Sequence, residues 1–514
     1  MNKKVLFLLP CMFLGFLSGC SKEDIDSSLP SSEQEKESSS FKYEDSSSSS
    51  SYVPEARNLY VSPNGSRNGD GSRTSPYDFM TGVTKLTLGS TLFLMEGTYP
   101  FSNPQIISNS SGDDSTDSYF AQKEEERRTI QPEIIDGKNA VVRFDFSSMS
   151  FSSSNRGISL NSDYWTLKDI ELFGAGDNGV YVGGNHNIVE NLDIHDCQDS
   201  GLQLGRKNSR CTSMDMWPSD NLIKNVTSHD NHDPSGEDSD GFACKLTTGV
   251  GNVFDGCISY NNVDDGWDLY TKGDTGPIGP VTIRNCVAFN NGITTKGIGT
   301  NNSDGNGFKL GGEGISVSHK VENCIAFNNL ATGFTDNSNP GTISFRNCTA
   351  FNNGTRDLDA ANFDLCRDPK TSSNFYQNLL SFCYGERTNP ITGAVSKANS
   401  RDRYKGSTGY SIFYSGMSML KYEEAEYGDF SVSSKAGALY KEPNGKLPFL
   451  SMKSIQEQSK KDVPAKEIVD VHKKYRNCDG SIALGDFLKV NPESEFYTMG
   501  ENHKPLGADL SGGK

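Results

Sequence analysis

The chain has 514 residues, with 49 basic against 66 acidic side chains and a formal net charge of −17 at pH 7. This acidic balance argues against nucleic acid as a partner, because a surface that binds phosphates is basic. A polyanionic ligand would need a cation to bridge it to such a protein. The length by itself suggests several domains.

The N-terminal stretch has the layout of an export signal. Lys3 and Lys4 precede a mostly apolar run, and Leu17-Ser18-Gly19-Cys20 closes it. The run is too short to favour a membrane span. Leu-Ser-Gly-Cys resembles the bacterial lipoprotein cleavage box, so we expect residues 1–19 to be a lipoprotein signal peptide and Cys20 to carry lipid. An ordinary secretory signal is the alternative.

Residues 20–56 are rich in Ser and Glu and hold few apolar side chains. Such a composition cannot bury a core, which predicts a flexible tether. Ser21-Lys22-Glu23-Asp24 resembles the acidic tag of surface-exported lipoproteins in Bacteroidetes. We therefore expect an outer-membrane lipoprotein exposed at the cell surface, a monomer that meets the membrane only through its lipid.

The globular part opens with two short strand-like stretches, Tyr60 to Gly65 and Gly89 to Tyr99. They resemble the first coil of secreted right-handed β-helices that act on polysaccharides. We assign residues 57–157 to an opening coil and N-terminal cap, with an amphipathic cap over residues 76–88. Polar, irregular sequence follows, and regular coils are expected from Ile158 onward.

Two motifs then recur along the chain. An Asn-Cys-x-x-aromatic-Asn phrase, or a looser version, starts at Asn191, Asn225, Gly256, Asn285, Asn323, Asn347 and Asn378, at intervals of 24 to 38 residues. A polar-Gly-hydrophobic motif precedes five of these phrases, those from Asn225 to Asn347: Ser200-Gly201-Leu202, Asp240-Gly241-Phe242, Asp265-Gly266-Trp267, Asn306-Gly307-Phe308 and Thr332-Gly333-Phe334. Repeats of this length, with alternating strand-like segments, are typical of a β-solenoid.

The repeat predicts an all-β fold, a parallel β-helix over residues 158–389 in which equivalent residues stack in columns about 4.8 Å apart. One column is apolar and inward: Leu192, Val226, Cys257, Cys286, Cys324, Cys348 and Leu379. A second column, Asn261, Asn290, Asn328 and Asn352, lies at a turn, where we expect amide-to-amide hydrogen bonds between coils.

Residues 390–514 no longer repeat. We expect last strands near Tyr410 to Phe413 and Asp429 to Val432, helix-forming sequence from Lys453 to Tyr475, and an irregular tail packed along the stack. Of the twelve cysteines, the inward ones are expected to pack as small hydrophobes. Cys211, Cys366 and Cys478 lie outside the regular coils and are candidates for pairing.

Aligning the glycines of the second motif brings four carboxylates together from two neighbouring coils: Asp240, Asp264, Asp265 and Asp268. Strand alternation would separate Asp265 from Asp268, and a bend at Gly266 is needed to reunite them. Asp-Gly pairs are also ordinary turn residues. Four such carboxylates would nevertheless repel one another without a cation, and oxygen ligands of this kind suit Ca²⁺.

Lys309 falls in the column of Asp268, one coil further on, and should point outward. Such a lysine is usually a solvated side chain. Beside a divalent cation, however, its ammonium form is disfavoured, and it becomes a usable general base. A base next to calcium suits β-elimination on a uronic acid, in which the cation acidifies the C5 proton and stabilises the developing charge.

Three motifs, taken in this order, resemble those of the family 9 polysaccharide lyases. They are Asp240-Gly241-Phe242, Asp264-Asp265-Gly266-Trp267-Asp268 and Gly305-Asn306-Gly307-Phe308-Lys309-Leu310-Gly311-Gly312. The resemblance covers residues 160 to 385. It implies a right-handed parallel β-helix, calcium on the four aspartates, Lys309 as the base, and an acidic plant cell-wall polysaccharide (pectin) as substrate. Either homogalacturonan or the rhamnogalacturonan-I backbone fits. One departure is the extra stretch from Lys296 to Asn302, which could alter the cleft.

Arg206, Lys245, Tyr270 and Lys272 follow the strands that carry the site and are candidates for binding uronate groups, although a residue of this kind, taken alone, is more often a solvated side chain. Two rival functions stay open. One is a glycoside hydrolase on the same fold that uses Asp264 or Asp265, and the other is a non-catalytic surface protein that binds glycans. Replacing Lys309 by alanine would separate them from a lyase.

Overall fold

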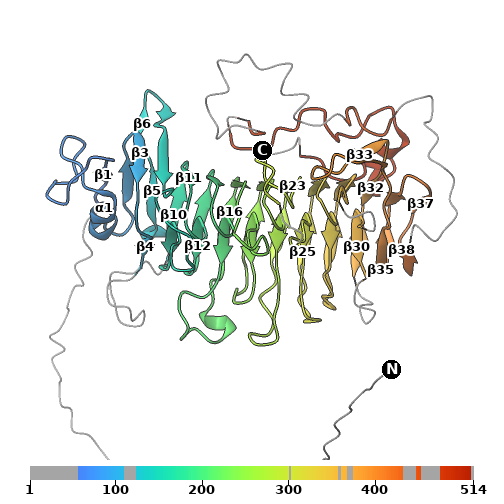
Figure 1. Cartoon of the computed structure of the whole chain (residues 1–514), viewed down its shortest axis with the longest axis horizontal. Coiled ribbons are helices and arrows are strands. Elements are labelled where there is room, and N and C mark those ends of the chain that lie inside the picture. Colours follow the sequence, from blue (N-terminus) through green and yellow to red (C-terminus); the bar gives the residue numbers. More distant parts are fainter. Residues whose placement is uncertain are drawn as a thin grey trace, which may run out of the picture. The chain divides into compact units, whose positions relative to one another are not determined.

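The computed structural model describes residues 56–108, 123–299, 302–356, 360–366, 374–431, 447–452, 475–477 and 479–510. The predicted signal peptide and nearly all of the predicted tether lie outside this part. From residue 56 onward the chain winds into a parallel β-helix, whose coils follow one another along the horizontal axis of Figure 1. The all-β prediction is confirmed.

Each regular coil adds one short strand to each of three rows. The first row carries the site: β4 (Gln105–Ile107), β9 (Ile158–Leu160), β12 (Val180–Val182), β15 (Leu202–Leu204), β18 (Phe242–Cys244), β21 (Trp267–Asp268), β24 (Phe308–Lys309), β27 (Phe334–Thr335) and β30 (Phe363–Leu365).

The second row follows it around each coil: β1 (Leu59–Val61), β2 (Thr91–Leu94), β5 (Arg128–Pro132), β10 (Trp165–Lys168), β13 (Ile188–Glu190), β16 (Leu222–Lys224), β19 (Val253–Asp255), β22 (Thr282–Arg284), β25 (Lys320–Glu322), β28 (Ser344–Arg346) and β31 (Phe375–Gln377). The long strand β35 (Arg403–Gly409) pairs with both rows.

The third row closes each coil: β3 (Gly97–Pro100), β8 (Val142–Asp145), β11 (Glu171–Phe173), β14 (Asp193–His195), β17 (Thr227–His229), β20 (Ile258–Tyr260), β23 (Val287–Phe289), β26 (Ile325–Phe327), β29 (Thr349–Phe351), β32 (Leu380–Phe382), β36 (Ile412–Tyr414) and β37 (Met419–Lys421). Short additions are the antiparallel pairs β6 (Ile134–Ile135) with β7 (Lys138–Asn139) and β33 (Glu386–Thr388) with β34 (Val395–Lys397), and β38 (Glu426–Ser431) beside β35. Short 3₁₀ turns are η1 (Glu124–Glu126), η2 (Met214–Met216), η6 (Glu495–Tyr497) and η7 (Glu501–His503).

The N-terminal end is covered by the helix α1 (Phe79–Lys85), which lies within the predicted cap. Asp78 caps it by accepting a hydrogen bond from the backbone N–H of Thr81 (2.9 Å). Phe79 then packs edge-on against Phe144 of β8, at 5.1 Å between ring centroids. The parallel stack already starts with β1, β2 and β5, so the expectation that coils begin at Ile158 was too late. The irregular sequence between these strands hides their alternation.

Stacked aromatic rings fill the interior under the first row. Phe242, Trp267 and Phe308 are fully buried, and successive ring centroids lie 4.6 to 4.7 Å apart. The same ladder continues through Phe334 and Phe363. The predicted inward column is also confirmed, since its leucines, valine and cysteines are all buried in one core. Packing of these side chains fixes the register of the site-bearing strands above them.

The predicted asparagine ladder forms one residue later than expected. Asn261 has a positive φ of 54° and donates from its side chain to the backbone oxygen of Ile293. The amide-to-amide chain runs instead through the buried residues Asn231, Asn262, Asn291, Asn329, Asn353 and Asn362, with Nδ2 to Oδ1 distances of 2.8 to 3.0 Å. The left-handed residue turns the chain, so the following side chain is the one that faces the next coil.

The described parts of the tail pack on the outer face of the third row. Phe449, Phe487 and Phe496 share a core with aromatic residues of that row, and the tail runs above the stack in Figure 1, which confirms the predicted packing. The strands expected near Phe413 and Phe430 are present in β36 and β38. Apart from Tyr475, the predicted helix lies outside the described residues.

Two further observations bear on the sequence analysis. No helix within the described ranges is both long and apolar enough to cross a membrane. Neither Cys211 nor Cys366 forms a disulfide in the part of the chain that the structure describes, so the candidate pairing between them is wrong. Cys478 is not among the described residues.

Candidate active site

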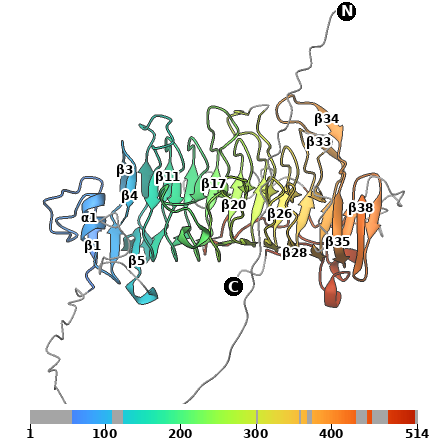
Figure 2. The ribbon, with the colours of Figure 1, turned by 90° about the horizontal axis from the view of Figure 1, so that it is seen from below.

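The register of the first row places the predicted columns side by side. Parallel pairing joins Ala243 to Asp268 and Asp268 to Lys309, and the same column continues to Thr335. Figure 2 shows the stack from below. The sequence alignment on Gly241, Gly266 and Gly307 therefore gave the correct spatial register.

The glycine of this motif is required by close packing between coils. A Cβ on Gly266 would lie 2.5 Å from the backbone oxygen of Gly307, and one on Gly307 would lie 2.5 Å from that of Gly333. The structure has a bend at Gly266. At this corner Oδ2 of Asp265 lies 3.1 Å from the ammonium of Lys309, the residue that pairs with Asp268 in the next coil.

Three carboxylates meet at this corner. One oxygen from each of Asp240, Asp264 and Asp265 lies within 4.8 Å of the others, and all three side chains are buried. Asp268 is buried too, but its carboxylate pairs with the ammonium of Lys245, at 3.1 Å. The structure thus assembles three of the four predicted ligands as one group and sets the fourth beside it.

Each carboxylate of the corner uses one oxygen to hold the backbone. Asp240 accepts from the N–H of Asp265 (3.2 Å), and Asp265 accepts from the N–H of Asn306 (2.7 Å). Asp264 accepts from the N–H of Asp304 (2.6 Å). These bonds show that the aspartates are also structural residues of the turn.

The remaining oxygens fit a cation. Two carboxylate oxygens, Oδ2 of Asp265 and Oδ1 of Asp268, are buried and accept no hydrogen bond of good geometry among the described residues. Oδ2 of Asp265 does form an ion pair with the ammonium of Lys309, at 3.1 Å. Buried carboxylate oxygens of this kind need a positive partner. An all-oxygen donor set of acidic side chains is the type that Ca²⁺ takes.

Burial and the repulsion between neighbouring carboxylates shift the pKa values of the aspartates at the corner. Burial is the main cause that raises the pKa of Asp265 to about 6, against the opposing effect of Lys309. Burial, reinforced by Asp265 and Asp240, also holds the pKa of Asp264 well above its usual range. For Asp268, burial is outweighed by the two lysines, so its pKa is lowered. A cation would relieve the repulsion that keeps protons on this group.

Lys309 is only 11% exposed and lies 3.1 Å from Asp265 and 2.8 Å from Asp304. Burial, the largest single influence on its pKa, acts to lower it, but the surrounding carboxylates together hold the pKa well above its ordinary value. The Tyr270 ring borders the same ammonium, with its centroid 5.6 Å from Nζ. The base candidate is therefore held firmly at the edge of the carboxylate corner.

Asp304 is a site residue that the sequence analysis missed. Its side chain is 55% exposed, unlike those of the corner. Arg356 holds its backbone by donating to the carbonyl oxygens of Ser303 and Asp304, at 2.9 Å each. The only sequence signal was the extra stretch from Lys296 to Asn302, which comes just before Asp304 in the sequence.

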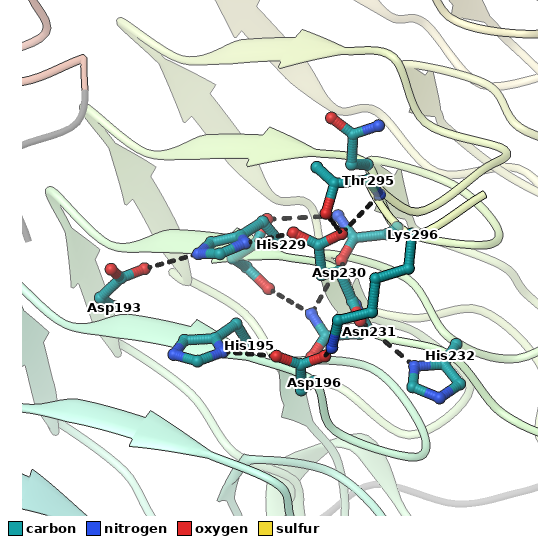
Figure 3. A network of polar contacts seen from close by, with 12 residues as sticks. Asp193, His195, Asp196, His229, Asp230, Asn231, His232, Thr295 and Lys296 are labelled. Carbon is teal, nitrogen blue, oxygen red and sulfur yellow. Dashed lines mark hydrogen bonds and ion pairs between the residues drawn. The ribbon is translucent and has the colours of Figure 1, made fainter. Parts of the chain in front are cut away.

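The start of this loop is fastened to two earlier coils (Figure 3). Thr295 donates from its backbone N–H and its hydroxyl to Asp230, both at 2.6 Å, and Lys296 pairs with Asp196. Asp230 and Asp196 also pair with His229 and His195, whose rings stack 5.0 Å apart. The loop therefore reaches back along the stack and borders the site.

The four candidate substrate residues lie in different settings. Tyr270 borders Lys309, and its hydroxyl bonds Glu313 at 3.4 Å. Lys272 is exposed, and Arg206 is half-buried beside Tyr181, which donates to its carbonyl oxygen. Lys245 turns into the carboxylates and is only 12% exposed. Contact with a substrate stays a prediction for all four.

Comparison with known proteins gives consistent matches. The family model described as the Pel9A-like right-handed β-helix region matches residues 59–378. Pectate lyase L of Paenibacillus polymyxa is 42% identical over 355 residues, which cover 67% of this chain and 76% of the relative. The crystal structure of pectate lyase Pel9A superposes with a TM-score of 0.61 at 23% identity, covering 88% of this chain and 96% of that one. A rhamnogalacturonan lyase structure gives 0.55 at 20% identity, with 85% and 97% covered.

Fold, site and comparisons together define the class: a polysaccharide lyase built on a right-handed parallel β-helix. The chain belongs to the Pel9A-like family, the family 9 polysaccharide lyases that its sequence motifs resemble.

Proposed function

We propose that this pectic polysaccharide lyase cleaves homogalacturonan or the rhamnogalacturonan-I backbone by calcium-dependent β-elimination, with Lys309 as the general base. The observation that carries the proposal is the position of Lys309 on β24, where its largely buried ammonium lies 3.1 Å from Asp265 of the carboxylate corner. Pectate lyase relatives and the likeness to a rhamnogalacturonan lyase support a pectic substrate.

In this mechanism Asp240, Asp264 and Asp265 would hold the cation, with Asp268 beside them. When bound, calcium supplies a positive charge that attracts the uronate carboxylate, acidifies the C5 proton and disfavours the ammonium form of Lys309. Neutral Lys309 then takes the C5 proton on Nζ. The C4–O bond breaks with its electron pair, the C4–C5 double bond forms, and the C4 oxygen leaves on the departing chain.

The test is the ultraviolet absorbance of the unsaturated product, with polygalacturonate and rhamnogalacturonan-I as parallel substrates. A rise that disappears with chelator and returns with calcium is expected on at least one polymer. Lys309→Ala should lower kcat by about 10²–10⁴-fold, which is the usual contribution of a general base, while still binding polymer. Reducing ends without absorbance would indicate hydrolysis, and binding without turnover in the unaltered protein would indicate a glycan-binding protein.

We further propose that the mature protein is a lipoprotein anchored through Cys20 and displayed at the cell surface, as its N-terminal sequence suggests. A surface location would place the site next to polymers too large to cross a membrane. Metabolic labelling with a lipid analogue tests this, because Cys20→Ser should abolish the label and release the protein.

A further inference from the structure

Lys245 is the second lysine of the carboxylate corner, and the proposed reaction gives it no task. Its ammonium lies 2.8 Å from Oδ2 of Asp240 and 3.1 Å from Oδ2 of Asp268. It thus bridges two neighbouring coils, since Asp240 precedes β18 and Asp268 lies in β21. Because its ammonium pairs with two buried carboxylates, Lys245 is not an ordinary solvated lysine.

The backbone directs Lys245 toward this position. It follows β18 directly, and the left-handed Leu246 (φ 63°) turns the chain after it. Thr248 donates to the backbone oxygen of Lys245, at 3.3 Å. These contacts hold the base of the side chain, so the ammonium reaches the two aspartates without crossing the open surface.

The oxygens that Lys245 occupies are ones that a divalent cation would otherwise use. Asp268 has one oxygen bound to Lys245 and the other, Oδ1, buried without a hydrogen bond. Asp240 shares Oδ2 between Lys245 and the hydroxyl of Ser200 (3.1 Å). An ammonium and a calcium ion placed on the same carboxylates repel each other, because both carry positive charge at short range.

We propose that Lys245 is a built-in counter-ion of this centre, which holds Asp240 and Asp268 in the metal-free protein and with which calcium must compete for their oxygens. The inference rests on the proposed calcium function and deepens it. Lys245 keeps the corner folded when calcium is scarce, and it sets the calcium affinity lower than the carboxylates alone would give. Asp268 is then the ligand whose availability Lys245 controls.

The experiment is calorimetric titration of the full-length protein with calcium alone. It compares the unaltered protein, Lys245→Met, Asp268→Asn and the double variant. Removing the competing charge should tighten calcium binding in Lys245→Met by about tenfold or more, and should lower the melting temperature measured without calcium. In the double variant most of the gain should disappear, because the freed carboxylate is absent. Lys320→Met, an exposed lysine on β25, is the matched control and should change neither quantity.

The outcomes separate the two proposals. No calcium binding by the unaltered protein would overturn the calcium function itself. If the unaltered protein binds calcium and Lys245→Met binds it with the same or a lower affinity, the counter-ion role alone would be overturned. A raised KM for the polymer in Lys245→Met would then assign Lys245 to substrate binding. Lys245→Arg, which keeps the charge, should bind calcium as the unaltered protein does. Circular dichroism verifies that each variant is folded. If Lys245→Met does not fold, Lys245→Gln takes its place.

Discussion

Asp304→Asn should move the acid limb of the pH–rate profile. The Asp304 carboxylate lies 2.8 Å from Lys309 Nζ and is one of the charges that raise the pKa of this lysine. Because the Asp304 side chain is 55% exposed, its charge is screened nearly as in water. Coulomb's law at this distance and the dielectric constant of water gives about 1.5 kcal/mol, or about one pH unit.

Asparagine keeps the shape of the side chain and leaves the backbone bond from Asp304 to Asp264 in place. The variant should therefore lower the pKa of Lys309 and shift the acid limb of kcat/KM to lower pH by about one unit, since this limb reports the essential base of the free enzyme. The assay is initial rate of ultraviolet absorbance across pH at saturating calcium. Glu313→Gln, which removes a neighbouring carboxylate bonded to Tyr270 instead, should leave the limb in place. An unmoved or raised limb in Asp304→Asn would refute Lys309 as the titrating base.

Three further predictions concern stability. Burial acts to lower the pKa of His195, but hydrogen bonds to Asp196 and Glu171 outweigh burial and raise the pKa to about 10. Protonated His195 therefore stabilises the folded protein fully below pH 6.5, and this contribution is lost as the pH approaches 10. His195→Gln should flatten the decline in melting temperature over that range. Arg476→Met should cost about 3 kcal/mol in denaturant unfolding, because it leaves unpaired the buried acceptors of the four hydrogen bonds that the guanidinium donates. Arg403→Met, at an exposed ion pair, should cost at most about 1 kcal/mol. Trp267→Ala should cost about 3–5 kcal/mol by leaving a cavity in the aromatic ladder, and a loss below 1 kcal/mol would contradict the described packing.

The fold was predictable because each coil repeats the same local physics. The column of Cys286 and Cys324 follows from the recurring Asn-Cys motif, and a one-residue error in aligning its copies would have turned the whole column outward. The same reasoning misplaced the asparagine ladder by one position. Asn290 has φ 54°, and a left-handed residue breaks the alternation on which the column assignment relied.

The site was predictable only where the repeat reaches. Asp240, Asp265 and Lys309 belong to aligned motifs, so their positions in the repeat predicted that these three side chains lie close together. Asp304 lies in an inserted loop, and nothing local shows that its partner is Lys309. The direction of Lys245 depends on the turn after β18. Contacts such as Lys296 to Asp196, 100 residues apart, are set by where an insertion folds back and leave no periodic signal.

The tail changes how the stack should come apart. In a solenoid each coil touches only its neighbours, so the ends can fray one coil at a time. Here Arg476 bonds the backbone of Val226 and Gly256, and the same tail later bonds Asn323, Thr349 and Asn378. Loss of one coil would break contacts shared with distant ones. The tail also packs against Asn191 at Gly480. The coils between Asn191 and Asn378, which include the carboxylate corner, should therefore melt together as one cooperative unit, while the coils before β13 keep the freedom to fray.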